Sequence, residues 1–165
     1  MRMVFRWFGE GNDSVSLTKI KQIPGVEGIV WALHDIPAGE IWPLDRIQEV
    51  KKQTDLYGFH LDVVESVNIH ESIKLGSADR DVYIMNYLET IKHLASVGVK
   101  VICYNFMPVF DWVRTDLFRS LPDQSTALFY EKEKVTAMDP LELVRKIAAN
   151  PDYTMPGWEP ERLKR

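Results

Sequence analysis

Four short runs of mainly apolar residues recur along the first two-thirds of the chain. They cover residues 4–8, 28–33, 60–64 and 100–104, and the apolar positions inside each run are nearly continuous. A strand with one solvated face alternates apolar and polar side chains, whereas a strand buried on both faces does not. The runs therefore predict four β-strands with both faces covered.

Helical patterns lie between these runs. A weak one covers residues 16–22, and a better one begins at Pro43, a favourable first-turn residue, and ends at Gly58. A third ends at Gly98, which suits a left-handed C-terminal cap, and has apolar residues at steps of three and four. Those apolar residues are Ile84, Tyr87, Leu88, Ile91, Leu94 and Ala95. These spacings predict three helices that alternate with the strands.

A long segment, residues 105–138, separates the last predicted strand from a fourth predicted helix. That helix begins at Asp139-Pro140, which supply an N-cap and a first helical residue, and its apolar stripe is Leu141, Val144 and Ile147. Connections between a strand and a helix usually have roughly 2–6 residues. We interpret the 105–138 segment as a largely irregular binding loop or lid, with a short strand at residues 128–130.

The order of strands and helices predicts parallel strands joined by right-handed crossovers, and therefore an α/β fold. Closed barrels and open doubly wound sheets both satisfy this order. The glycine-rich signatures of dinucleotide and P-loop nucleotide binding do not occur in the sequence. Periodicity alone leaves the barrel and the open sheet as alternatives.

Composition and charge narrow the function classes. The chain is 45% hydrophobic and 27% charged, which is typical of a globular protein, and its net charge of −4 gives no general attraction to nucleic acid. Its apolar runs are too short to cross a membrane, and its first residues lack a signal-peptide pattern. The single cysteine, Cys103, excludes an internal disulfide. We expect a cytoplasmic protein that binds neither nucleic acid nor membrane.

Candidate functional residues lie at the strand ends, where parallel α/β proteins collect their chemistry. Arg6 and Trp7 belong to the first run, and an arginine among apolar residues either pairs with a buried carboxylate or holds a ligand carboxylate. His34 follows the second run, as a base, a metal ligand or a hydrogen-bonded loop residue. Glu65 ends the third run and is a candidate general acid or base.

The densest cluster follows the fourth run. It contains Tyr104, Asn105, Trp112 and Arg114. Aromatic rings cover the C–H faces of a sugar chain, while amide and guanidinium groups pair with its hydroxyl and carboxylate oxygens. The alternative is a loop held by Asp–Arg pairing and by aromatic packing against the rest of the fold.

Several long segments together resemble the first half of mannonate dehydratase. They match in the same order over nearly the whole chain, and they read MRMVFRWFG, QIPGVEGIVWALHDIPAGEIW, VVESVNIHESIKLG, NYLETIKHLASVGVKVICYNFMPVFDWVRTDL and PGWEPERL. The resemblance implies a TIM-type (β/α)8 barrel of the xylose-isomerase-like kind, of which residues 1–165 supply about the first four βα units. It also implies a hydro-lyase that removes water from D-mannonate to give 2-keto-3-deoxy-D-gluconate in hexuronate (glucuronate) catabolism, with Mn²⁺ or Fe²⁺.

The sequence departs from the family at the metal site. The family's ligand motifs, of the types His-Pro-Asp-Asp-Pro, Cys-Thr-Gly-Ser and Arg-Pro-Asp-His-Gly, belong to the second half and do not occur here. A complete barrel needs roughly 250 residues. We therefore expect a fragment of a single barrel domain that carries substrate-side residues and no metal ligand.

Strand-end position and side-chain chemistry assign the roles of individual residues in such an enzyme. We expect Glu65 and His34 to be catalytic and to lie near the substrate hydroxyls, and Arg6 to bind the substrate carboxylate. The pocket wall is assigned to Trp7, Tyr104, Asn105, Trp112 and Arg114. The alternatives are a non-catalytic half-barrel that self-associates through its open sheet edges, and a sugar isomerase on the same fold. We also expect the protein to form a homo-oligomer.

Overall fold

The computed structural model of the chain describes residues 2–107 and 114–149. The chain divides into two compact units, residues 1–109 and residues 110–165, and each is described here by itself. The first unit contains the four predicted strands and the predicted candidate residues up to Asn105. It is therefore the unit that carries most of the candidate chemistry.

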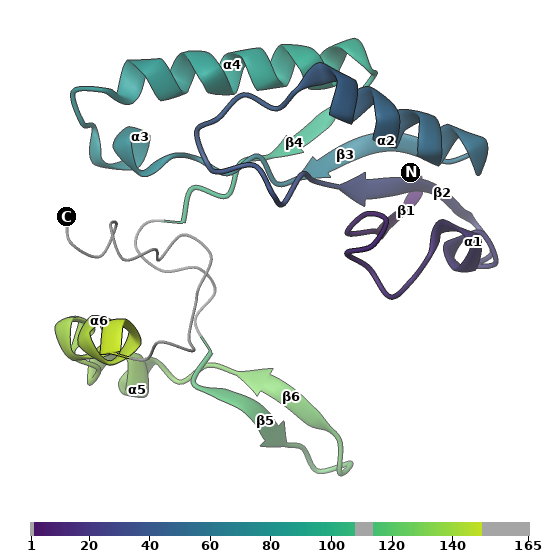
Figure 1. The fold of residues 1–165 in the computed structure, drawn as a ribbon. Coiled ribbons are helices and arrows are strands. Elements are labelled where there is room, and N and C mark those ends of the chain that lie inside the picture. The colour runs from purple at the N-terminus through teal and green to yellow at the C-terminus, as the bar shows by residue number, and fades with distance from the viewer. Residues whose placement is uncertain (1, 108–113, 150–165) are drawn as a thin grey trace. The chain divides into compact units, whose positions relative to one another are not determined.

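A four-stranded parallel sheet forms the centre of the first unit (Figure 1). Its strands are β1 (Met3–Arg6), β2 (Val26–Trp31), β3 (His60–Glu65) and β4 (Val101–Cys103), and they lie side by side in chain order. Each neighbouring pair is parallel. The prediction of an α/β fold with a parallel sheet is confirmed.

Helices connect consecutive strands, as the sequence predicts. They are α1 (Leu17–Ile20), α2 (Leu44–Leu56), α3 (Glu71–Leu75) and α4 (Arg80–Ser96). Only the short α3 was not predicted. Its His70 side chain accepts a hydrogen bond from the Ser72 amide at the start of the helix, and Gly76 ends the helix with a φ of 67°. A side-chain cap and a left-handed glycine thus define the two ends of this short helix.

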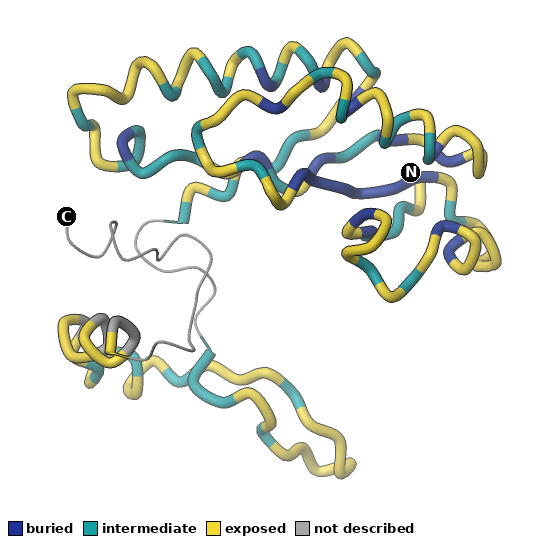
Figure 2. The backbone as a smooth tube through the Cα atoms, viewed as in Figure 1, coloured by how far each residue is buried: buried dark blue, intermediate teal, exposed yellow. Residues whose placement is uncertain are grey.

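The hydrophobic core lies between the sheet and its helices. Figure 1 shows α2 and α4 on the same side of the sheet, and Figure 2 shows that most of β2 is buried. The largest fully buried side chains are Trp7, Phe59, Ile20, Ile29, Ile47, Leu61, Leu94 and Val64. They come from strands, helices and connections alike, which makes the first unit one packed core.

The prediction that both faces of every strand are covered is wrong for the described part of the chain. Val101 in β4 is 50% exposed, and Met3 in β1 is also exposed. Glu65 at the end of β3 is exposed as well. The apolar runs indicate strands with two apolar faces, but the described helices cover only one of these faces.

The second unit begins with an antiparallel hairpin of β5 (Asp116–Ser120) and β6 (Thr126–Phe129). The helices α5 (Lys132–Thr136) and α6 (Pro140–Ala149) follow. The expectation of a largely irregular 105–138 segment is therefore wrong, because a hairpin and a helix lie within it. The predicted α6 is confirmed, although the side chains of Val144 and Ile147 lie outside the described residues. The lid role of the segment stays a prediction.

Candidate functional site

Strand register brings three polar side chains to one face of the sheet, at the carboxyl ends of the strands. Arg6 is in register with Val30, and Val30 with Val63. Glu65 lies two residues beyond Val63 and pairs with Cys103. Because side chains alternate between the two faces of a strand, Arg6, Glu65 and Cys103 share a face. This agrees with the electrostatic influence of both Glu65 and Cys103 on the guanidinium.

Arg6 contacts two side chains that follow neighbouring strands. Its Nη2 lies 3.5 Å from His34 Nε2, and its guanidinium carbon lies 4.6 Å from the centre of the Phe8 ring. The Phe8 and His34 rings are themselves 5.5 Å apart. The guanidinium therefore lies between the end of β1 and the loop after β2.

Arg6 also keeps one donor group available. Its Nη1 is buried and has no hydrogen-bond partner among the described residues. Burial lowers the pKa of Arg6, and the charge of Glu65 opposes that shift. A buried donor without a partner carries a desolvation cost, and a bound anion would remove it.

The contact with Arg6 fixes the protonation of His34. A guanidinium donates hydrogen bonds and cannot accept them, so His34 Nε2 is the acceptor and carries no proton. Partial desolvation lowers the pKa of His34, and the positive charge of Arg6 lowers it further. Asp35 acts in the opposite direction. His34 is therefore held neutral, which is the state that a general base needs.

A chain of side-chain hydrogen bonds joins the loops after β3 and β4. Asn105 Nδ2 donates to Ser66 Oγ over 2.7 Å, and Ser66 Oγ donates to Asn68 Oδ1 over 2.7 Å. Asn105 has a φ of 42°, a left-handed conformation that asparagine tolerates better than most residues. The neighbouring Tyr104 is exposed. Asn105 thus holds the Ser66 side chain next to Glu65, while Tyr104 is accessible to a ligand.

The remaining predicted residues divide into three cases. Trp7 is 1% exposed and belongs to the hydrophobic core, so its burial does not agree with a place on the substrate-pocket wall. It leaves β1 one residue after Arg6 and points to the helix-covered face. Trp112 lies outside the described residues, and Arg114 belongs to the second unit, so the roles assigned to these two residues stay predictions.

Two residues at the site were missed by the sequence reasoning. Ser66 connects Asn105 to Asn68, and Asp13 accepts hydrogen bonds from the Phe8 and Val15 amides over 2.9 Å each. Asp13 fixes the loop after β1, and its charge acts on Arg6. The position of Ser66 directly after a strand was a usable signal. Nothing local distinguishes Asp13 from other loop aspartates.

The described residues contain neither a cluster of potential metal ligands nor a helix that could span a membrane. Within residues 2–107 and 114–149, no three His, Cys, Asp or Glu side chains lie together as a metal would require. The expectation that the metal ligands lie outside this chain stays a prediction. None of the helices that the structure describes has the length and apolar character needed to span a membrane.

Comparison with known proteins gives consistent matches. Residues 1–165 match the sequence model of the family described as D-mannonate dehydratase (UxuA). Mannonate dehydratase 1 of Halalkalibacterium halodurans is 72% identical over 163 residues, which are 99% of this chain and 45% of that protein. The mannonate dehydratase of Bacillus subtilis is 60% identical over 165 residues, which are 100% of this chain and 46% of that protein.

A solved structure agrees with these matches. Mannonate dehydratase from Streptococcus suis serotype2 has a TM-score of 0.80 and 44% sequence identity, covering 91% of this chain and 44% of that chain. The chain thus spans about half the length of the curated relatives it matches. The resemblance drawn from the sequence is confirmed, and the chain belongs to the D-mannonate dehydratase (UxuA) family.

Proposed function

We propose that this chain is the amino-terminal part of a D-mannonate dehydratase. The reaction is the elimination of water from D-mannonate to give 2-keto-3-deoxy-D-gluconate in hexuronate (glucuronate) catabolism. The family match over residues 1–165 and the names of the relatives support this activity. The chain covers 45% of the Halalkalibacterium halodurans relative, and the proposed activity is that of a whole protein to which this chain contributes one part.

The complete fold is proposed to be a TIM-type barrel of the xylose-isomerase-like kind. A parallel sheet with strands in chain order, and with a helix between consecutive strands, is what the first half of such a barrel requires. The exposed Val101 and Glu65 lie on strands whose second face would become the barrel interior. Four further βα units would cover that face and close both sheet edges.

The observation that carries the proposal is the buried Nη1 of Arg6, which has no partner among the described residues. A guanidinium is the natural partner of a carboxylate, which it binds through parallel N–H groups. The carboxylate of D-mannonate would complete the hydrogen bonding of Arg6. Arg6 is therefore the proposed anchor of the sugar acid.

A carboxylate on Arg6 also orients the reacting carbons. C2 is bonded directly to the carboxylate carbon, so it would lie close to the neighbours of Arg6, which are His34 and Glu65. One of these two groups accepts the C2 proton, and the other protonates the C3 hydroxyl as it leaves as water. The resulting enol becomes the 2-keto-3-deoxy acid. Tyr104 and Asn105 are proposed to line the sugar chain, with Trp112 and Arg114 from the following segment.

A divalent ion is part of the proposal, and we expect its ligands outside this chain. Mn²⁺ or Fe²⁺ would supply electrophilic stabilisation of the substrate oxygens. No three potential ligands come together within residues 2–107 and 114–149, so we expect all of them from the second half of the protein. A cytoplasmic location and a homo-oligomeric state also belong to the proposal.

A chimeric enzyme tests the function. Residues 1–165 are joined to the second half of the Halalkalibacterium halodurans relative and assayed with Mn²⁺ and D-mannonate for formation of the 2-keto-3-deoxy acid. We expect activity from the chimera and none from the 165-residue chain alone. A folded chimera without dehydration would contradict the proposal, and an isomerised product would favour the isomerase alternative.

The same assay tests Arg6. Replacing it by methionine in the chimera should lower kcat/KM about 10- to 100-fold, because a hydrogen-bonded charge contributes roughly 1.5–3 kcal/mol. Arg2→Met is the matched control, since Arg2 pairs with Glu27 and Asp62 and lies before β1, away from the carboxyl ends of the strands. A loss of kcat/KM no larger than that of Arg2→Met would show that Arg6 does not bind the substrate.

A further inference from the structure

We propose that α4 is a positioning element for the site, acting through a polar stripe that holds the β2–α2 loop. The β2–α2 loop comprises residues 32–43, and the polar stripe comprises Asn86, Thr90 and His93. The inference rests on the proposed function, because the loop carries His34. It assigns these three residues to positioning, since none of them contacts His34, Arg6 or Glu65.

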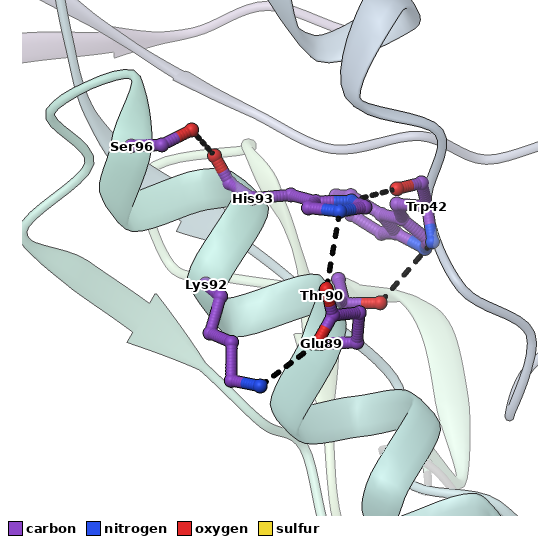
Figure 3. Close-up of polar contacts among 6 residues, drawn as sticks. All are labelled: Trp42, Glu89, Thr90, Lys92, His93 and Ser96. Carbon is purple, nitrogen blue, oxygen red and sulfur yellow. Dashed lines mark hydrogen bonds and ion pairs between the residues drawn. The ribbon is translucent and has the colours of Figure 1, made fainter.

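The stripe binds backbone groups of the loop directly. Asn86 Nδ2 donates to the carbonyl of Gly39 over 2.9 Å. The Trp42 amide donates to Thr90 Oγ1 over 3.1 Å, and His93 Nδ1 lies 2.8 Å from the Trp42 carbonyl (Figure 3). Spacings of four and three residues place all three side chains on one face of the helix. That face is turned toward the loop and the sheet.

The His93 contact has a defined direction. A carbonyl only accepts hydrogen bonds, so His93 Nδ1 is the donor and carries a proton. His93 Nε2 lies 3.6 Å from Glu89 Oε1, one helical turn earlier (Figure 3). Glu89 in turn accepts from Lys92 Nζ over 2.9 Å. The ring is therefore oriented from both sides, with its Nδ1–H toward Trp42.

Close packing adds to the hydrogen bonds at Gly39. The rings of His70 and Tyr83 stack with their centres 3.5 Å apart and their planes at 14°. A Cβ on Gly39 would lie 2.6 Å from Tyr83 Cδ1 and 2.8 Å from His70 Cδ2. Only a glycine fits there, and its φ of 91° also favours glycine. The loop is thus fitted closely against α4 and the residues before α3.

Within the loop the Glu40 amide donates to the Pro37 carbonyl over 3.2 Å, and the stripe adds the hydrogen bonds at Gly39 and Trp42. Trp42 and Thr90 are buried, so their polar groups cannot turn to water when the contact is lost. At the other end of the loop, Asp35 accepts from Arg46 Nη1 of α2 over 2.8 Å. These contacts hold the β2–α2 loop near both of its ends, and we infer that they keep His34 in contact with Arg6. The loop, α4 and residues 66–68 also line a small cavity of about 20 Å³, room for roughly one water molecule.

Hydrogen exchange on the 165-residue chain tests the structural step. Thr90→Val keeps the shape of the side chain and removes the acceptor of the Trp42 amide. We expect the amides of residues 38–42 to exchange about tenfold faster, as for the loss of one net hydrogen bond. Thr90→Ser keeps a hydroxyl and should restore the slow exchange. Unchanged exchange in Thr90→Val would overturn the proposal.

A matched control separates this effect from a general loss of stability. Thr54 is buried in α2 like Thr90, but its hydroxyl donates to Lys51 of its own helix. Thr54→Val should therefore leave the exchange of residues 38–42 unchanged relative to the rest of the chain. If Thr54→Val raised the exchange rate of residues 38–42 as much as Thr90→Val does, the proposal would also be overturned.

A second variant acts through packing alone. Gly39→Ala meets both rings, whereas Gly11→Ala has a similar positive φ of 79° and no atom within 4 Å of the new Cβ. We expect faster exchange of residues 38–42 in the first variant only. Equal behaviour of the two variants would show that the fit against α4 does not order the loop.

Activity in the chimera tests the positioning role itself. Thr90→Val should lower kcat about tenfold or more relative to Thr54→Val, with KM changed less, because displaced reacting groups slow the chemical step. Equal kcat values in the two variants, with faster loop exchange in Thr90→Val, would overturn the positioning role and leave the proposed function intact. An inactive unmodified chimera would instead contradict the proposed function, and the exchange experiment would still decide whether α4 orders the loop.

Discussion

Among the single residues, partial desolvation and the neighbouring Arg6 both lower the pKa of His34, a candidate base. Because the shift lowers the pKa of His34 below its ordinary value of 6.5, the unfolded chain binds the proton at a higher pH than the folded chain. His34 therefore makes the free energy of unfolding rise as the pH rises from the lowered pKa of the folded chain to the ordinary value of 6.5. This contribution to stability is lost as the pH falls back through the lowered pKa.

An NMR titration of the His34 ring checks this relation. In the unmodified chain His34 should titrate below 6.5, and Arg6→Met should raise its pKa toward that value, because one of the two lowering causes is removed. Arg2→Met removes the same charge without contacting the ring and should leave the pKa unchanged. If both variants leave the pKa equally unaffected, Arg6 is not the cause of the shift.

The candidate residues differ in how much their local sequence revealed. Arg6, His34 and Glu65 were found from their positions at the strand ends, and the structure brings them together. Trp7 has the same local signature, yet it is a core residue. Adjacent residues of a strand point to opposite faces, so a shift of one position exchanges pocket and core. A pattern whose strand boundaries are uncertain by a residue cannot separate the two.

At the scale of elements, α4 shows that periodicity predicts a helix better than it predicts its buried face. The apolar stripe predicted for this helix includes both Leu88 and Leu94, but Leu88 is 44% exposed and Leu94 is fully buried. The face that packs against the loop and the core also carries Thr90, a polar residue that is fully buried. The hydrogen bond from Trp42 makes that burial favourable, and no single-helix pattern contains it.

Two alanine substitutions in α4 test this assignment of faces. Leu94→Ala should lower the free energy of unfolding by about 2–5 kcal/mol, because it leaves a cavity in the core. Leu88→Ala should change it by no more than about 0.5 kcal/mol, as is usual for surface positions. Urea unfolding of the 165-residue chain measures both. A larger loss of unfolding free energy in Leu88→Ala than in Leu94→Ala would show that Leu88 lies on the buried face of α4.

The hairpin of β5 and β6 was largely missed for a related reason. Its strand residues are mostly exposed, and Arg119 of β5 contacts the Phe129 ring of β6 at 4.0 Å and pairs with Glu131 just after β6. An exposed hairpin does not need the apolar alternation that marks a strand in a sequence. Its cross-strand pairs become visible only when the partner strand is known.

At the scale of the whole molecule, the first unit has a sheet with two edges that are unpaired within the described residues. β1 and β4 each pair with one neighbour only, and Val101 on β4 is exposed. Unpaired edges invite association with another chain. In the proposed barrel these edges would be joined by the second half of the protein.

We therefore expect the 165-residue chain to associate with itself in solution. Light scattering during size-exclusion chromatography should give a mass above that of one chain, and Val101→Lys should lower it, because edge lysines oppose strand pairing. Val82→Lys, on the exposed face of α4, is the control and should leave the mass unchanged. Adding the separately expressed second half of a relative should replace self-association by a mixed complex. Monomeric behaviour of the unmodified chain would show that the edges are protected.

The amino-acid sequence was sufficient to predict the order of the four strands and their helices, the α/β class and the family. Apolar runs, helix caps and long matching segments are local features, so each can be recognised in turn along the chain. The folded arrangement was needed to see which side chains share the face of Arg6, that Trp7 belongs to the core, and that α4 contacts the β2–α2 loop. Those outcomes depend on strand register and on contacts between residues such as Trp42 and Thr90, 48 positions apart, which no local pattern encodes.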